Sequence, residues 1–173
     1  MVNDGLSAVY TLNGETRRWR GSAQALPTGI PAEAQELRVT RFHSCNEAFV
    51  TSGKPSAGVL KPTGVGLELV PVSHPNDLVA GSKATFSFLI DGKPAAGLDV
   101  TVIPGGIRYR DRLGEMKLTT DKDGRFSVTW PQPGMYWIGA SHGATGPMEQ
   151  SGGSASQPAR RASYAATLEI LPQ

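Results

Sequence analysis

The sequence predicts an all-β protein: an antiparallel β-sandwich preceded by a small N-terminal β unit. Charged residues make up only 18% of the 173 residues, while the chain has 21 Gly and 13 Pro. Such a composition favours short strands joined by turns. Several segments alternate apolar and polar residues with the period of a strand. Nothing between them is long and periodic enough for a crossover helix, so neighbouring strands are expected to be antiparallel.

The N-terminal β unit is expected over residues 1–62. The segments SAVYTL and ETRRWRG flank Asn13-Gly14, and both of these residues accept the positive φ of a type I′ hairpin turn. One helical turn is expected in PAEAQEL, with Pro31 at its first position. ELRVTRF is predicted to be a strand, and EAFVTSG is a candidate for another. Residues 51–64 have the composition of a linker.

The sandwich is expected over residues 63–173, with roughly seven or eight short strands at the even spacing typical of that fold. The candidate strands are VGLELVPV, SKATFSFLI, LDVTVIP, RYRDR, EMKLTT, RFSVTW, GMYWIGA and SYAATLEIL. Turns are expected at SHPND and DGKPAAG. Residues 143–162 are polar and rich in Gly and Ser, so they are predicted to form a flexible loop before the last strand.

Two aspartates and a glycine in TTDKDGRF raise the question of a calcium loop. An EF-hand loop beginning at Asp121 would need an oxygen ligand at its fifth position and a carboxylate at its twelfth. This chain has Arg125 and Gln132 there. We therefore expect a turn between two paired strands, with Asp121 capping the backbone and Gly124 in the left-handed conformation.

The charge and hydropathy of the chain bear on whether it binds nucleic acid or spans a membrane. The formal net charge is +2, and the arginine clusters at 17–20 and 108–112 alternate with aromatic or acidic residues, as on the solvent face of a strand. Nucleic acid is therefore not an expected partner. No apolar run approaches the length needed to span a membrane. The first residues, MVNDGLSAVY, lack the basic and apolar regions of a signal peptide, so we expect a cytoplasmic chain or one whose targeting segment has been removed.

Three segments carry a fold-level resemblance. DGKPAAGLDVTV, TTDKDGRFSVTW and PGMYWIGA resemble the sandwich modules of the transthyretin-like and carboxypeptidase-regulatory-like type, in which a strand pair is followed by a turn glycine and a tyrosine corner-like strand. This resemblance implies a transthyretin-like or immunoglobulin-like β-sandwich. It implies nothing about activity, because such marks are structural.

A wider resemblance runs from about Leu6 to Leu171. With NGETRRWRG, AFVTSGKPS and GVGLELVPVSHPNDLVAG added, the chain is similar to a bacterial periplasmic family of unknown function labelled as a nickel uptake substrate-specific component. The resemblance implies a non-catalytic periplasmic binding or accessory protein linked to uptake of nickel, cobalt or another transition metal. Its partners would be a metal ion or a membrane uptake system. Fuller members begin with a signal peptide and a further β segment, so the chain is expected to be truncated and its first β unit incomplete.

If the protein binds a metal ion, His74 and His142 are the first candidates for its ligands. His74 lies in the turn SHPNDL, where Asn76 or Asp77 could orient its ring. His142 begins the Gly/Ser-rich segment. Loops at one end of a sandwich often lie close together, so the two histidines could converge; the alternative is an ordinary surface histidine in each turn.

A weaker alternative is the pair His43 and Cys45, two residues apart. On a strand both side chains point to one face, and nickel and copper accept imidazole nitrogen and sulfur. A free cysteine is more often a small buried hydrophobic residue. In that case the pair has a structural role.

Other functions are weighed against metal handling. The main alternative is a cell-surface β-sandwich interaction module that binds a protein or saccharide through its loop ends; an exposed aromatic patch with Trp19 or Trp137 would mark it. In the 143–162 segment, Arg160 and Arg161 could bind a carboxylate or phosphate. Catalysis is not expected, because no nucleophile motif surrounds Cys45; a small hydrolase is the third alternative. The sequence leaves the ligand, the partner protein and the oligomeric state open.

Overall fold

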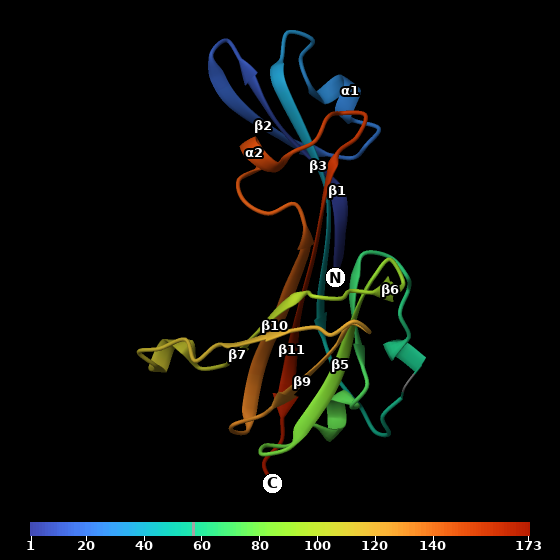
Figure 1. Cartoon of the computed structure of the whole chain (residues 1–173), viewed down its shortest axis with the longest axis vertical. Coiled ribbons are helices and arrows are strands. Elements are labelled where there is room, and N and C mark those ends of the chain that lie inside the picture. Colours follow the sequence, from blue (N-terminus) through green and yellow to red (C-terminus); the bar gives the residue numbers. More distant parts are fainter. Residues whose placement is uncertain (57) are drawn as a thin grey trace. The chain divides into compact units, whose positions relative to one another are not determined.

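The structure is a computed structural model that describes residues 1–56 and 58–173, without the side chain of Glu149. About half of the residues lie in strands (Figure 1), which confirms the all-β prediction. Contacts divide the chain into two compact units. The first, the N-terminal unit, contains Val2–Ser44 and His142–Ala162; the second, the sandwich unit, contains Met1, Cys45–Ser141 and Ser163–Gln173.

The strands and helices have the following bounds. The strands are β1 (Val2–Leu12), β2 (Glu15–Gly21), β3 (Gln35–Ala48), β4 (Leu67–Pro71), β5 (Lys83–Ile90), β6 (Lys93–Pro94), β7 (Asp99–Pro104), β8 (Met116–Thr119), β9 (Arg125–Thr129), β10 (Gly134–Gly143) and β11 (Ala159–Ile170). The short helices are α1 (Leu26–Gly29) and α2 (Met148–Ser151), and single 3₁₀ turns are η1 (Gly58–Leu60), η2 (Pro75–Asp77) and η3 (Ile107–Tyr109). Within the described ranges, no helix has the length and hydropathy needed to cross a bilayer.

The β1–β2 hairpin forms as its sequence predicts. Leu12 pairs with Glu15 in the antiparallel register, which leaves a two-residue loop. Asn13 and Gly14 fill this loop with φ of 52° and 78°, the left-handed values that a type I′ turn requires. β1 then pairs with β3 on its other side. The small core of the N-terminal unit contains Leu6, Ala8, Leu26 and Val39, with Trp19, Ile30 and Leu37 packed against it.

The helical turn lies earlier than predicted. α1 spans Leu26–Gly29 with Pro27 in its first turn, whereas Pro31 only accepts a backbone hydrogen bond from Ala34 in an isolated turn. The physical reason is burial: Leu26 reaches the core, while no residue of the predicted segment 31–37 is buried. The strand expected in ELRVTRF lies within β3, which continues to Ala48. The candidate strand EAFVTSG is wrong beyond that point, because residues 49–53 belong to no strand.

The 142–162 segment packs within the N-terminal unit. Gly153 exchanges two backbone hydrogen bonds with Val39 of β3, at 2.8 and 2.9 Å. A Cβ at Gly152 would lie 2.7 Å from the Cβ of Arg38, so only glycine allows this approach. The division between the two compact units therefore differs from the boundary expected between residues 62 and 63. Each unit combines segments that are far apart in the sequence.

The sandwich unit consists of two sheets. One has the order β4-β5-β6, with β9 also paired to β5; the other is the β11-β10-β7-β8 part of a seven-stranded sheet with the order β2-β1-β3-β11-β10-β7-β8. Rings from the two sheets meet edge to face: Phe88 lies 5.4 Å from Tyr164 and Trp130 lies 5.0 Å from Tyr136, measured between ring centroids. The Tyr136 hydroxyl donates a hydrogen bond to the Gln132 carbonyl at 2.9 Å, which is the geometry of a tyrosine corner.

The turn at Asp121 forms, but its flanking strands do not pair with each other. Asp121 Oδ1 accepts hydrogen bonds from the backbone N–H groups of Asp123 and Arg125 at 2.9 and 2.8 Å, and Gly124 has φ of 71°. However, β8 pairs with β7, and β9 pairs with β5 of the other sheet. The expected hairpin is therefore wrong: the turn carries the chain from one sheet to the other.

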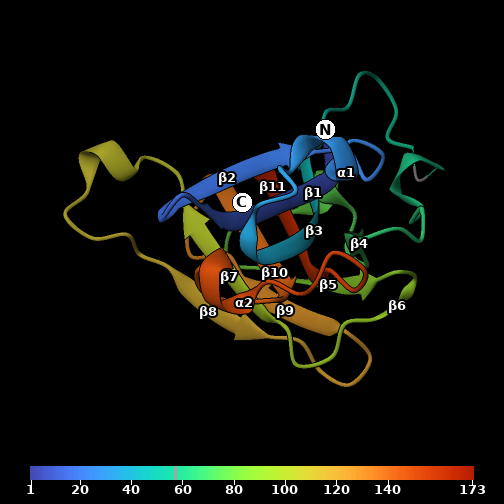
Figure 2. The ribbon, with the colours of Figure 1, turned by 90° about the horizontal axis from the view of Figure 1, so that it is seen from above.

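The candidate strand RYRDR is also wrong. Residues 107–109 form the 3₁₀ turn η3 inside a long loop between β7 and β8. This loop extends away from both strands (Figures 1 and 2). Gly106, with φ of 75°, is the N-cap residue of η3.

Candidate functional site

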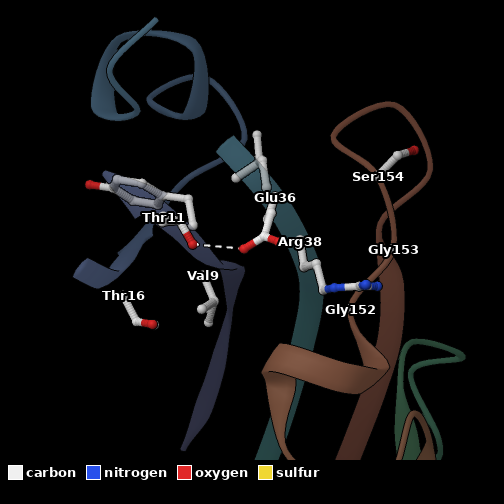
Figure 3. A pocket seen from close by; sticks show the side chains of 10 residues that line it. Val9, Thr11, Thr16, Glu36, Arg38, Gly152, Gly153 and Ser154 are labelled. Carbon is white, nitrogen blue, oxygen red and sulfur yellow. Dashed lines mark hydrogen bonds between the residues drawn. The ribbon is translucent and has the colours of Figure 1, made fainter. Parts of the chain in front are cut away.

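The N-terminal unit contains a cleft of about 530 Å³, which we call the β1–β3 cleft (Figure 3). Residues of β1, β2 and β3 line it together with the segment 152–154. The lining residues are Val9, Tyr10, Thr11, Thr16, Glu36, Leu37, Arg38, Gly152, Gly153 and Ser154. The lining is mainly polar and includes one acidic and one basic side chain.

Glu36 stands at the start of β3 in an uncommon backbone conformation. Its φ is 53°, a left-handed value that costs a non-glycine residue free energy. Its carboxylate accepts a hydrogen bond of 2.9 Å from the Thr11 hydroxyl on β1, as Figure 3 shows. The bond leaves further lone pairs on the carboxylate for a ligand. Strain of this kind often accompanies binding sites.

Arg38 lies two residues after Glu36, and both residues line the cleft. It is exposed, and across residues 1–56 and 58–173 it forms no hydrogen bond or ion pair. Figure 3 shows its side chain extending toward Gly152 and Gly153. The guanidinium is therefore available for a bidentate bond to a carboxylate or phosphate.

The side chains of this cleft offer several kinds of polar contact. Its lining contains hydroxyls, one carboxylate and one guanidinium. Arg38 would hold an anionic group, and Glu36 would accept hydroxyl or ammonium donors. The cleft volume falls in the range of small-molecule sites, about 300–1,000 Å³.

His74 lies at a second cleft, of about 380 Å³, in the sandwich unit. Its Nδ1 accepts a hydrogen bond from the backbone N–H of Asn76 at 3.2 Å and so caps η2. Neutral His74 must then carry its proton on Nε2, and this buried nitrogen has no partner among the described atoms. A metal could bind Nε2 only if the proton left this nitrogen, and a move of the proton to Nδ1 would break the hydrogen bond from Asn76.

The other predicted ligands have separate surroundings. His142 is exposed in the N-terminal unit, whereas His74 belongs to the sandwich unit. His43 is half-buried, and its Nδ1 is buried without a partner. Burial, and then the negative charge of Glu47, raise the pKa of the buried Cys45 thiol, which disfavours the thiolate that binds metals.

No group of three or more His, Cys, Asp or Glu side chains that could hold a metal ion occurs in the described part of the chain. Among the described side chains, the structure thus brings no third ligand of these four types to His74 and His142 or to His43 and Cys45. Metal binding by His74 and His142, or by His43 and Cys45, stays a prediction.

Three further residues were singled out from the sequence, and the structure gives each of them different surroundings. Arg161 donates hydrogen bonds to the carbonyls of Ala144 and Gly146, both at 2.8 Å, so it braces its own segment. Trp19 packs against the small core of the N-terminal unit. Trp137, on β10, is 42% exposed. Glu36 and Arg38 were not singled out, because only the approach of Gly152 and Gly153 turns that part of β3 into a cleft.

Comparison with known proteins gives one family. The family described as "Domain of unknown function (DUF4198)" matches residues 2–144. No curated protein and no solved structure matches the chain. The family description assigns no activity, ligand or partner.

Proposed function

The chain belongs to the family described as "Domain of unknown function (DUF4198)", and from its own geometry we propose that it is a non-catalytic binding protein. Its ligand site is the β1–β3 cleft. The ligand class is a small molecule with one anionic group and several hydroxyls, such as an acidic sugar.

This proposal rests on the guanidinium of Arg38, which has no partner among the described residues and lines the same cleft as the carboxylate of Glu36. A bond from a guanidinium to a ligand carboxylate contributes about 1.5–3 kcal/mol. Glu36 would repel a second anionic group but accept hydroxyl donors, so the pair favours a ligand with its charge at one end. Thr11 holds the Glu36 carboxylate at 2.9 Å before a ligand arrives, which lowers the cost of ordering the site.

A second candidate is an accessory role in transition-metal uptake in the periplasm. The resemblance to the family labelled as a nickel uptake component supports it. The same cleft favours one form of this role: a metal carried as a carboxylate chelate needs no cluster of protein ligands, because Arg38 can bind the chelator. Nickel or cobalt would then be cargo rather than a resident cofactor.

Calorimetry with matched titrants tests the binding proposal. Glucuronate is expected to bind and glucose to bind much more weakly, since only glucuronate offers a carboxylate. Arg38→Gln should weaken glucuronate binding at least about tenfold. The control is Arg41→Gln, which removes another exposed arginine of β3 outside the cleft. Equal affinity in the Arg38→Gln and Arg41→Gln variants, or no binding of any anionic titrant, would sink the proposal.

The metal-uptake candidate needs nickel chloride, citrate and nickel citrate as titrants. Tighter binding of nickel citrate than of citrate, lost in Arg38→Gln, supports the chelate form. Binding of nickel chloride that survives Arg38→Gln and disappears in His74→Ala or His142→Ala would instead support the histidine site and contradict the chelate form.

A further inference from the structure

We propose that the loop of residues 105–115, between β7 and β8, is a docking surface for anionic lipid bilayers. The first observation is the exposure of its apolar side chains. Tyr109 is 85% exposed and Ile107 51% exposed, and Leu113 is also exposed. Large apolar side chains gathered on one projecting loop are unusual for a surface that meets only water.

The charges of the loop complement an anionic surface. Between residues 107 and 113 there are three arginines and one aspartate. Arg108 and Arg112 are exposed beside the apolar residues, while Glu115 forms an ion pair with Lys117 at 3.2 Å. A basic residue near an anionic leaflet contributes about 1 kcal/mol of attraction.

The third arginine holds the loop in place. The Arg110 guanidinium donates a hydrogen bond to the Pro104 carbonyl at the base of the loop. A Cβ at Gly114 would lie 2.9 Å from Nη1 of Arg110, so the glycine makes room for the guanidinium. Backbone hydrogen bonds from Tyr109 to Gly106 and from Arg110 to Ile107 close η3. The apolar side chains are therefore presented by an ordered turn, which reduces the entropy lost on docking.

The exposed apolar surface continues onto β10. Gly105 donates a backbone hydrogen bond of 2.6 Å to the Met135 carbonyl, which joins the loop base to that strand. Met135 is 50% exposed, and Trp137 is exposed two residues further along. Tyrosine and tryptophan are the residues that favour the headgroup region of a bilayer, and arginine keeps its charge in water while its stem covers apolar surface.

The projecting shape of the loop favours a bilayer over a protein as its partner. The loop projects from its sheet in both views (Figures 1 and 2), and no residue of it lines either cleft described above. A projecting turn with apolar and basic residues side by side can enter the boundary between headgroups and acyl chains. The area involved is small, so docking would be reversible.

Vesicle co-sedimentation tests the proposal with the full chain. Vesicles of phosphatidylcholine mixed with phosphatidylglycerol should bind the protein, and binding should fall as salt is raised. Vesicles of phosphatidylcholine alone should bind it far less. Arg108→Gln with Arg112→Gln should lower partitioning on the order of twentyfold, since each arginine contributes about fivefold. Ile107→Ser should lower it at least about tenfold.

Matched variants keep the test decisive. Val65→Ser removes another exposed apolar side chain, and Lys61→Gln with Lys122→Gln removes two exposed charges; both are expected to bind vesicles like the unaltered chain. No vesicle binding, equal binding to both lipid compositions, or equal loss in loop and control variants would overturn the proposal. Glucuronate binding by the loop variants should be unchanged, so failure here is distinguishable from failure of the cleft.

Discussion

Two turn glycines, Gly14 and Gly124, share a left-handed backbone but differ in their surroundings. Their φ values are 78° and 71°. A Cβ at Gly14 would meet no atom within 4 Å, whereas a Cβ at Gly124 would lie 2.5 Å from the Phe88 carbonyl oxygen. Gly124 is therefore required both for its φ and for the close approach of β5, while Gly14 is required for its φ alone.

Alanine at these two positions should separate strain from steric clash. Gly14→Ala is expected to lower the free energy of unfolding by about 1 kcal/mol, the cost of a left-handed alanine. Gly124→Ala should lower it by at least about 2–3 kcal/mol, because backbone atoms must also move. Urea unfolding of both variants measures the difference. Equal losses would show that the contact with Phe88 is relieved at little cost.

At the scale of elements, the 142–162 segment decides whether a cleft exists. Its hold on β3 is the pair of hydrogen bonds between Gly153 and Val39. A Cβ at Gly153 would lie 2.2 Å from the carbonyl oxygen of Gln157 and 2.6 Å from the nitrogen of Ala159. The segment can therefore keep its path beside β3 only with glycine at this position.

Gly153→Ala should detach the segment from β3. Hydrogen exchange at the Val39 amide is expected to accelerate, because its acceptor moves away. Glucuronate binding should weaken in parallel if the β1–β3 cleft is the ligand site. Gly146→Ala is the control: it strains a residue of the same segment with φ of 85°, but its Cβ would meet nothing within 4 Å. Unchanged exchange at Val39 in Gly153→Ala would contradict the expected role.

For the whole molecule, the buried hydroxyl of Tyr164 and the buried thiol of Cys45 make the free energy of unfolding depend on pH in the alkaline range. Burial, and then the hydrogen bond from its hydroxyl to the Glu47 carboxylate, raise the pKa of Tyr164 well above its ordinary value of 10.0. Burial also raises the pKa of Cys45 above its ordinary 9.0. The unfolded chain thus releases these protons at a pH where the folded chain retains them. The stability that the folded chain has below pH 9 from these two groups is therefore lost as the pH rises further.

The free energy of unfolding should therefore fall as pH is raised above 9 and 10, the ordinary values for these groups. Each such group contributes up to about 1.4 kcal/mol per pH unit. Tyr164→Phe keeps the ring packed against Phe88 and should make this fall shallower. Tyr109→Phe, which removes an exposed tyrosine hydroxyl, is the control. Identical pH profiles for the two variants would refute the assignment to Tyr164.

Local chemistry made several features of this chain predictable from the printed residues. The Asn13-Gly14 hairpin and the Asp121 turn are closed by neighbours in the sequence, and alternation marks a strand whichever partner it finds. The all-β class follows from these short-range rules. The strands β5 and β7 accordingly lie where their alternation predicts them, whereas β11 begins at Ala159, inside the segment expected to be a loop.

Features that join distant residues were decided by folding alone. The alternation of apolar and polar residues predicts a strand but not the strand with which it pairs. The sequence therefore suggested that β8 and β9 pair with each other, whereas they belong to different sheets. The helical turn formed where Leu26 could be buried rather than where Pro31 suggested it. The β1–β3 cleft arises because Gly153 pairs with Val39 across more than half of the chain, and that contact gives Glu36 and Arg38 a common site.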